Sequence, residues 1–174
     1  MKEVILETPV STSNINRLEL GARVAINGTI YTARDATFNV LKDELKKKKN
    51  LVNSLKNSII YLCGPSPAPK KRLIGSCGPT TTQRMEPYVS LLSKLGVKAI
   101  IGKGKISASF LSALKKHNIA YLMAVGGAGA YLTTFIKDAS IVAYKNLGPE
   151  AVYKLEVENF PCIVAANKGK QIFR

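Results

Sequence analysis

The residues of this sequence best suited to binding or catalysis lie in three short polar stretches: TARD (32–35), PTTTQR (79–84) and GKG (102–104). These stretches supply five candidate side chains: Arg34, Thr80, Thr81, Arg84 and Lys103. Two guanidinium groups and an ammonium group suit a small dianion such as a dicarboxylate, because arginine holds a carboxylate through two parallel, charge-assisted hydrogen bonds. The threonine hydroxyls can donate to a carboxylate or position a reacting group. The combination predicts a site for a small dicarboxylate.

Each stretch also has a simpler interpretation. Arg34 and Asp35 could form an ion pair that starts a helix. The threonine run could supply hydroxyls that cap the N-terminus of a helix, and Lys103 could be a solvated lysine in a turn. The functional interpretation gains weight because all three stretches lie in the same kind of position and contribute the same sign of charge.

The elements that carry these stretches alternate between apolar strands and helical periodicity. The pattern predicts strands at 24–35, 58–64, 97–104, the start of 119–130, 140–148 and 160–169, and helices at 35–49, 85–96 and 107–118. Ser107, Asn118 and Gly96 are the expected helix caps. Alternation after residue 84 predicts parallel pairing there, while the first third of the chain is richer in strands. We therefore expect a layered α/β domain, in which binding sites lie at the ends of strands.

Other motifs in the sequence give weaker indications of function. GGAGA (126–130) lacks the GxGxxG spacing of a dinucleotide site, because Leu132 stands where the third glycine belongs, so it is interpreted as a close-packed strand-to-helix turn. Lys46–Lys49 is interpreted as the solvated end of a helix. His117, the single histidine, is expected to be exposed and without a catalytic role, and Cys63 to be a small buried hydrophobe.

Composition narrows the partners and the compartment. The 174 residues include 26 Lys+Arg against 11 Asp+Glu, a formal net charge of +15, which favours anionic partners. A nucleic-acid-binding α/β module is an alternative, although the chain has no recognisable nucleic-acid motif and no tryptophan for base stacking. Three widely spaced cysteines, with no signal peptide or membrane-spanning stretch in the sequence, predict a cytoplasmic protein.

Several blocks of the sequence resemble a known family. They are NGTIYTARDA, YLCGPSPA, IGSCGPTTTQRM, IGKG, AVGGAGA and LGPEAVYKLEVENFPCIVA, in the family's order. The chain resembles the β subunit, or the equivalent C-terminal domain, of the class I iron–sulfur fumarate hydratases and L(+)-tartrate dehydratases. The resemblance implies one domain over residues 1–174 with a mixed sheet and the layered β/β/α arrangement called a swivelling domain.

The resemblance also implies a division of labour. A separate α subunit holds a 4Fe-4S cluster whose open iron acts as a Lewis acid, and this chain has no metal ligand. The two subunits are expected to form an (αβ)2 assembly that hydrates fumarate to L-malate reversibly. The same chemistry on L-tartrate, giving oxaloacetate, is the near alternative, and alone the chain is not expected to be active.

Family roles carry over to the matching positions. Arg34 and Arg84 are expected to bind substrate carboxylates, Thr81 to lie next to the substrate, and Lys103 to complete the anionic pocket. Thr80 is the expected proton-transfer residue, although a threonine hydroxyl needs nearby positive charge to lower its pKa. One position departs from the pattern, because Phe38 stands where many relatives have a histidine.

Overall fold

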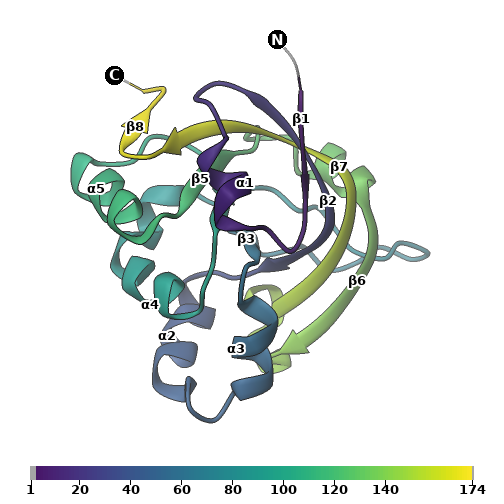
Figure 1. The fold of residues 1–174 in the computed structure, drawn as a ribbon. Helices are drawn as coiled ribbons and strands as arrows, with labels where there is room; N and C mark the ends of the chain where they lie inside the picture. Colours follow the sequence, from purple (N-terminus) through teal and green to yellow (C-terminus); the bar gives the residue numbers. More distant parts are fainter. Residues whose placement is uncertain (1–2, 174) are drawn as a thin grey trace.

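The computed structural model in Figure 1 describes residues 3–173. Within those residues, one mixed sheet contains the strands β1 (Val4–Glu7), β2 (Arg23–Thr32), β3 (Ile59–Tyr61), β4 (Ala99–Gly102), β5 (Ala120–Met123), β6 (Ile136–Ala143), β7 (Val152–Asn167) and β8 (Lys170–Gln171). Their order is β1-β2-β3-β4-β5-β7-β6, with β8 beside β7. Neighbours from β1 to β5 pair in parallel, whereas β7 is antiparallel to β2, β5, β6 and β8. The sheet is therefore mixed, as predicted.

Strand β7 closes the sheet on itself. It is 16 residues long and pairs with β2 along 154–163 and with β5 along 163–166. Since β2, β3, β4 and β5 are hydrogen-bonded in that order, the pairings form a ring. Strand β2 has a register shift at Gly28, where φ is +94° and an added Cβ would lie 2.5 Å from Thr8 Oγ1. Glycine permits this bulge, and bulges bend strands.

Alternating side chains of the parallel strands enter two different cores. Ile59, Tyr61 and Cys63 belong to the core between the two halves of the ring, whereas Ile60 and Leu62 belong to the core beneath the helices. Because both faces are buried, the strand is a continuous apolar run rather than an alternating one. Figure 1 shows α2 to α5 on one side of the molecule, with β6 and β7 on the other. The layered β/β/α arrangement of a single domain is confirmed.

The described helices are α1 (Thr12–Asn16), α2 (Asp35–Glu44), α3 (Lys49–Leu55), α4 (Val89–Lys94), α5 (Ala108–His117) and α6 (Gly129–Leu132), with 3-10 turns η1 (Thr82–Tyr88), η2 (Thr133–Phe135) and η3 (Lys145–Glu150). The expected caps of α5 are present: the Phe110 N–H donates to Ser107 Oγ at 3.1 Å, and Asn118 is left-handed at φ +52°. All helices of residues 3–173 are too short or too polar to span a bilayer.

Several predicted elements differ from the structure. The helix expected at 85–96 begins as the 3-10 turn η1, which contains Pro87, a residue without the N–H that an α-helical bond needs. The expected strand 140–148 instead begins at Ile136 and ends at Ala143. Strands β6 and β7 are antiparallel rather than parallel, because the short turn η3 between them leaves no room for the crossover that parallel strands need. The strand excess expected in the first third was wrong, since α1 to α3 lie there.

The weaker motifs have clear outcomes. GGAGA (126–130) does connect a strand to a helix, although α6 is a single turn. Cys63 is buried, as expected. His117 is half-buried rather than exposed, at the end of α5. Lys46 to Lys48 are exposed, but they form the turn between α2 and α3, and Lys49 begins α3.

Candidate functional site

The threonine segment, residues 79–82, lies between the ends of β3 and β4. On one side the Thr80 N–H donates to the Leu62 carbonyl at 2.7 Å. On the other side the Lys103 N–H donates to the Thr80 carbonyl at 3.0 Å, and the Thr82 N–H donates to the Lys103 carbonyl at 2.9 Å. These backbone hydrogen bonds bring the PTTTQR and GKG stretches together at the carboxyl ends of two parallel strands.

The three threonines differ in burial. Thr80 is half-buried and Thr81 is exposed, whereas Thr82 is fully buried. Thr80 and Thr81 therefore have surface that a ligand can reach, and Thr82 has none. Thr82 packs against β4, and its role is structural.

Glycines make room for the threonine segment. A Cβ added to Gly102 would lie 2.2 Å from Thr82 Oγ1 and 3.2 Å from the Thr80 carbonyl oxygen. A Cβ added to Gly129 of the GGAGA turn would lie 2.8 Å from the backbone nitrogen of Gly78. Carbon and oxygen atoms in ordinary contact lie about 3.5 Å apart. Gly102 and Gly129, one glycine of each motif, are therefore required by the close approach of the segment that carries Thr80.

A hydrogen bond from Tyr121 of β5 holds the GKG turn in place. The Tyr121 hydroxyl donates to the Gly104 carbonyl at 2.8 Å. Burial raises the pKa of Tyr121 to about 12, so the hydroxyl stays protonated and remains a donor at neutral pH. Gly104 adopts φ +84°, a left-handed conformation that other residues seldom adopt. Lys103, between the two glycines, is half-buried, so it is not the fully solvated lysine of the simpler interpretation.

Arg34 lies two residues after the end of β2 and occupies the N-cap position of α2. The chain is held there because the Ala33 N–H donates to the Tyr61 carbonyl at 3.2 Å, beside the end of β3. The guanidinium Nη2 of Arg34 lies 3.6 Å from Glu150 Oε1. A Cβ added to Gly64, the residue after Cys63, would lie 3.0 Å from Arg34 Nη1, so this side chain packs directly against the backbone that leaves β3.

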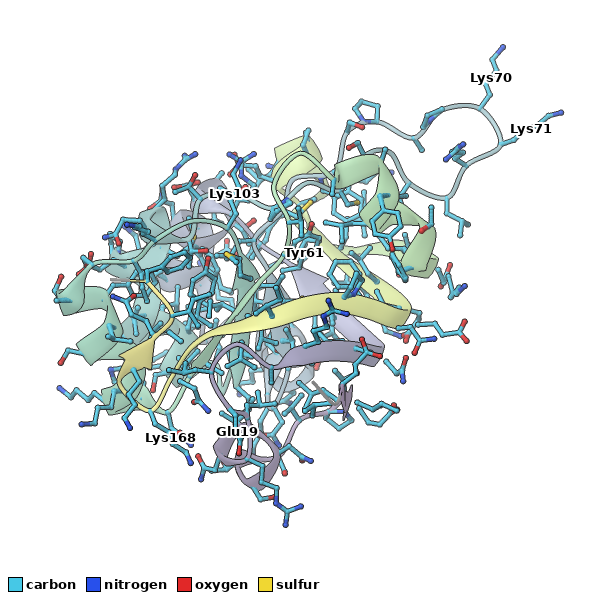
Figure 2. The ribbon with its side chains drawn as sticks, turned by 90° about the horizontal axis from the view of Figure 1, so that it is seen from above. Glu19, Tyr61, Lys70, Lys71, Lys103 and Lys168 are labelled. Carbon is cyan, nitrogen blue, oxygen red and sulfur yellow. The ribbon has the colours of Figure 1, made fainter. Side chains whose placement is uncertain are left out.

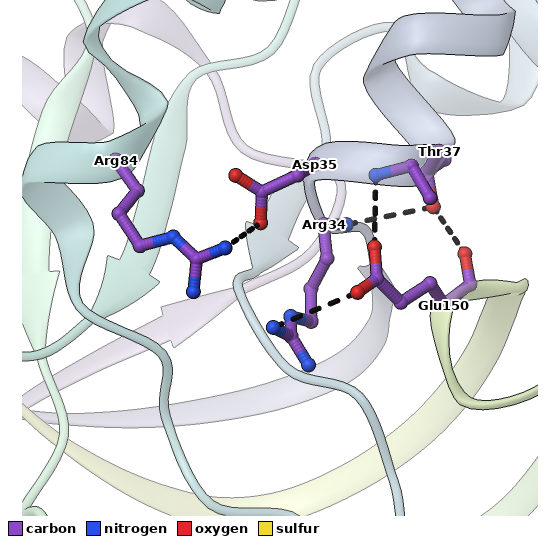
Figure 3. Close-up of polar contacts among 6 residues, drawn as sticks. Arg34, Asp35, Thr37, Arg84 and Glu150 are labelled. Carbon is purple, nitrogen blue, oxygen red and sulfur yellow. Dashed lines mark hydrogen bonds and ion pairs between the residues drawn. The ribbon is translucent and has the colours of Figure 1, made fainter.

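Arg84 lies in η1, which continues directly from the threonine segment. Its N–H donates to the Thr81 carbonyl at 3.4 Å. Its guanidinium Nη2 lies 3.0 Å from Asp35 Oδ2, at the first residue of α2 (Figure 3). Arg34 and Arg84 thus sit beside the same helix terminus, although 50 residues separate them in sequence.

Glu86 ties the turn that carries Arg84 to helix α5. Its carboxylate accepts hydrogen bonds from Ser109 Oγ at 2.5 Å, Gln83 Nε2 at 2.5 Å and Ser107 Oγ at 3.1 Å. These hydrogen bonds, that of Ser109 above all, lower the pKa of Glu86. Ser107 is also the N-cap of α5, so the position of η1 depends on the start of that helix.

The structure decides between the interpretations of the polar stretches. Arg34 does not pair with Asp35: it pairs with Glu150, and Asp35 pairs with Arg84. Thr81 is the N-cap residue of η1, but its side chain makes no capping hydrogen bond. Sequence reasoning missed Glu150, because no local pattern indicates a contact between residues so distant in the chain. Its position in the LGPEAVY block was the available signal.

The three cysteines do not form a metal site. Cys63, Cys77 and Cys162 are free thiols, each at most 5% exposed. A hydrogen bond with Cys77 and burial raise the pKa of Cys63, and burial raises the pKa of Cys162. Within residues 3–173, no group of three or more Cys, His, Asp or Glu side chains is placed to hold a metal ion. Cys63 and Cys77 share a hydrogen bond, which lowers the pKa of Cys77, but an iron–sulfur cluster takes about four thiolate ligands, so these residues do not fit one.

A family model described as the Fumarase C-terminus matches residues 1–174. The chain belongs to this family. It is 37% identical over 176 residues to Fumarate hydratase 2 of Leishmania major, covering 98% of this chain and 31% of that protein. It is 36% identical over 177 residues to the aerobic class I fumarate hydratase of Escherichia coli (strain K12), covering 100% of this chain and 31% of that protein. The chain thus spans about a third of the length of these relatives.

Another relative has nearly the length of this chain. A Methanocaldococcus jannaschii protein, whose name provisionally assigns it as L(+)-tartrate dehydratase subunit beta, is 36% identical over 171 residues. The match covers 94% of this chain and 88% of that protein. The Fumarase C-terminus family therefore includes both domains of longer enzymes and a protein named as a separate subunit.

Proposed function

We propose that this chain is the β component of a two-chain hydro-lyase that interconverts fumarate and L-malate. The observation that carries the proposal is the joining of three cations and two threonines at the carboxyl ends of β2, β3 and β4. Arg34, Arg84 and Lys103 supply the positive charge, and Thr80 and Thr81 supply the hydroxyls. The family's relatives named as fumarate hydratases support the choice of reaction.

The cations have a role in binding. Fumarate and malate each carry two carboxylates, and two guanidinium groups on either side of one helix terminus can each hold one end of a dianion. Lys103, whose backbone N–H donates to the Thr80 carbonyl, supplies a third positive charge. Charge-assisted hydrogen bonds of this kind also fix the orientation of the carbon atoms between the carboxylates, which positions them for reaction.

Thr80 is proposed to move the proton. In the dehydration direction it removes a proton from the carbon next to a carboxylate, and the hydroxyl group leaves from the neighbouring carbon. In hydration it returns that proton. The positive charges of Arg34 and Lys103 favour the alkoxide form of Thr80, because a nearby cation stabilises an anion and lowers its pKa.

The remaining parts of the catalytic site belong to a second chain. We infer an α-type subunit that carries the 4Fe-4S cluster, since the buried thiols of this chain do not fit one. The M. jannaschii protein, which is named as a beta subunit and is similar in length, supports a two-chain arrangement. An (αβ)2 assembly in the cytoplasm is our proposal for the whole enzyme, and three free cysteines are consistent with a reducing compartment.

L(+)-tartrate is the second candidate substrate. The M. jannaschii relative, which is named as a tartrate dehydratase subunit, supports L(+)-tartrate because it has nearly the length of this chain. Sequence identity does not discriminate, because this chain is 36% identical both to that relative and to the E. coli fumarate hydratase. Both substrates are dicarboxylates, so the arginines serve either one. L-tartrate carries one hydroxyl group more than malate, and we propose that residues of the second chain discriminate between the two.

The decisive experiment combines this chain anaerobically with the α-type chain from the same source, its cluster reconstituted. Fumarate, malate and L-tartrate are supplied in parallel. Fumarate–malate turnover that neither chain shows alone supports the proposal, and turnover of tartrate alone changes the substrate. A well-formed complex without turnover of any of them refutes the proposed activity.

Thr80→Ala tests the proton-transfer role in the same complex. Loss of a general base lowers the rate by about 10²–10⁴-fold. We expect kcat to fall in this range, with a much smaller change in substrate affinity, because the arginines and Lys103 are intact. Thr82→Val removes a hydroxyl from the buried third threonine and is the matched control. Unchanged kcat for Thr80→Ala assigns proton transfer to another residue.

A further inference from the structure

Two carboxylates, Asp35 and Glu150, pair with the arginines proposed to bind substrate. The sequence analysis assigned neither carboxylate a part in substrate binding. Figure 3 shows Asp35 beside Arg84 and Glu150 beside Arg34, at the first turn of α2. The guanidinium nitrogen and the carboxylate oxygen are 3.0 Å apart in the first pair and 3.6 Å apart in the second. The carboxylate side chains are 26% and 25% exposed, so both carboxylates are mostly buried.

Glu150 is held in place by contacts other than the arginine. Its Oε2 accepts a hydrogen bond from the Ala36 N–H at 2.8 Å, and its backbone carbonyl accepts one from Thr37 Oγ1. The first N–H groups of a helix have no partner within the helix, and the helix dipole places positive charge there. The N-terminus of α2 therefore fixes one oxygen of Glu150, which leaves the other oxygen to face Arg34.

Arg34 depends on this carboxylate for its orientation. Its side chain is 24% exposed, and Nε is buried with no hydrogen-bond partner among residues 3–173. Gly64 limits its movement on one side, at 3.0 Å from an added Cβ to Nη1. Glu150 is the carboxylate paired with this guanidinium in the described structure. Without that charge, only packing would hold the guanidinium.

Arg84 has a looser environment. Its side chain is 52% exposed, and a long exposed side chain samples several rotamers unless a partner restrains it. Asp35 is the first residue of α2, so its carboxylate lies close to the backbone and has little freedom of its own. The pair at 3.0 Å directs Arg84 toward the same helix terminus that carries Arg34 and Glu150.

We propose that Asp35 and Glu150 are positioning residues, which hold Arg84 and Arg34 in the orientations that bind the two substrate carboxylates. Glu150 stays in place when substrate binds, because the α2 backbone holds it. The three cations of the site outnumber the two carboxylates by one charge, so the site still attracts an anion. The inference rests on the proposed function only in taking the arginines as the carboxylate ligands.

The first test measures positioning without any activity. Because Arg34 Nε is buried, its N–H should exchange slowly with solvent in ¹⁵N NMR spectra of the 174-residue chain. Glu150→Gln keeps an oxygen for the Ala36 N–H but removes the charge facing Arg34. We expect the Nε–H exchange rate to rise about tenfold or more, as expected when a local opening becomes easier. Wild-type exchange in this variant overturns the proposal for Glu150.

A matched control comes from another ion pair of the same chain. Glu156 lies 2.9 Å from Lys154 and accepts a hydrogen bond from Thr29 at 2.7 Å, in the β2–β7 region away from the arginines. Glu156→Gln removes the same charge from an ordinary surface pair. It should leave the exchange of Arg34 Nε–H unchanged. An equal effect from both variants means that only the overall charge or stability matters, which overturns the positioning role.

The second test uses the complex with the α-type chain. A misplacement of about 1 Å can lower the rate about 10²-fold, so Glu150→Gln and Asp35→Asn should each lower kcat about 10–100-fold. KM should change less than about threefold, because the added net positive charge attracts the dianion more strongly and offsets the lost orientation. Wild-type kcat in both variants, or a loss of kcat that follows a loss of Tm, overturns the proposal.

The two tests separate this inference from the proposed function. If the complex shows no turnover of any substrate, the exchange rates still decide whether Glu150 orients Arg34, while the absence of turnover counts against the hydro-lyase proposal. If Glu150→Gln does not fold, Asp35→Asn carries the test through kcat, with its Tm as the check on stability.

Discussion

Replacing Gly102 with alanine should move the threonine segment. The added Cβ would lie 2.2 Å from Thr82 Oγ1 and 3.2 Å from the Thr80 carbonyl oxygen. An ordinary contact is about 3.5 Å, so the segment must shift by roughly 1 Å. Thr82 is fully buried and bonded through its backbone to Lys103, so rotation of one exposed side chain cannot relieve the overlap.

The size of the effect follows from overpacking in a dense core. Inserting one carbon where no space exists costs typically about 1–3 kcal/mol. For a domain of this length, each kcal/mol lowers Tm by about 2–4 °C, so a cost of about 2 kcal/mol gives a fall of about 4–8 °C. The same shift displaces Thr80, and we expect kcat of the complex with the α-type chain to fall about 10²-fold.

Thermal unfolding of the purified chain measures the first effect, and Gly126→Ala is the matched control. A Cβ added to Gly126 meets only Lys103 Cδ, at an ordinary 3.4 Å, so its Tm should stay close to that of the wild type. Adding Thr82→Ala to Gly102→Ala removes the overlapping oxygen and should recover about 1 kcal/mol beyond additivity. The close packing of the threonine segment against β4 is refuted if the two substitutions have strictly additive effects on the free energy of unfolding. An unchanged Tm for Gly102→Ala refutes it as well.

Three further predictions concern the surroundings of the site. Tyr121→Phe removes the hydrogen bond to the Gly104 carbonyl and should cost about 1 kcal/mol by denaturant unfolding, whereas Tyr131→Phe, at an exposed position, should cost nothing measurable. The folded-state pKa of Glu86 is depressed, so its stabilisation is complete above its ordinary pKa of 4.5 and is lost as the pH falls through the folded value. The Tm difference between wild type and Glu86→Gln should therefore shrink as the pH falls below 4.5, and a constant difference contradicts the network. The loop that carries Lys70 and Lys71 projects from the body of the molecule (Figure 2), so trypsin should cut there first. Mass spectrometry of the early fragments identifies the first cleavage site, and a first site elsewhere in the chain contradicts this prediction.

The central strands were predictable because their side chains are buried on both sides. IIY and AIIG are continuous apolar runs, and β3 and β4 occupy those residues. The caps of α5 were equally local signals, carried by Ser107 and Asn118. The first half of β7 was missed, although VYKLEVEN alternates between apolar and charged residues as a half-buried strand does. Its pairing with β2 joins segments far apart in the sequence, whereas β6 precedes it directly through η3.

The candidate side chains were chosen from the sequence because motif residues at strand ends combine charges with hydroxyl groups. The structure places Thr80, Thr81 and Lys103 on adjoining backbone segments, and Arg34 and Arg84 beside one helix terminus. Their partners were not predictable. The sequence neighbours Arg34 and Asp35 looked like a local ion pair, yet each binds a distant residue instead.

The sequence by itself determined the central strands β3 and β4, the helix α5, and which charges and hydroxyls lie near strand ends. Those properties depend on burial, capping and periodicity over a few neighbouring residues. Only the tertiary structure decided that β7 closes the ring, that Gly102 admits Thr82, and that Glu150 meets Arg34. The reason is physical: these contacts join segments that the chain brings together only when both cores pack, and no local interaction specifies them.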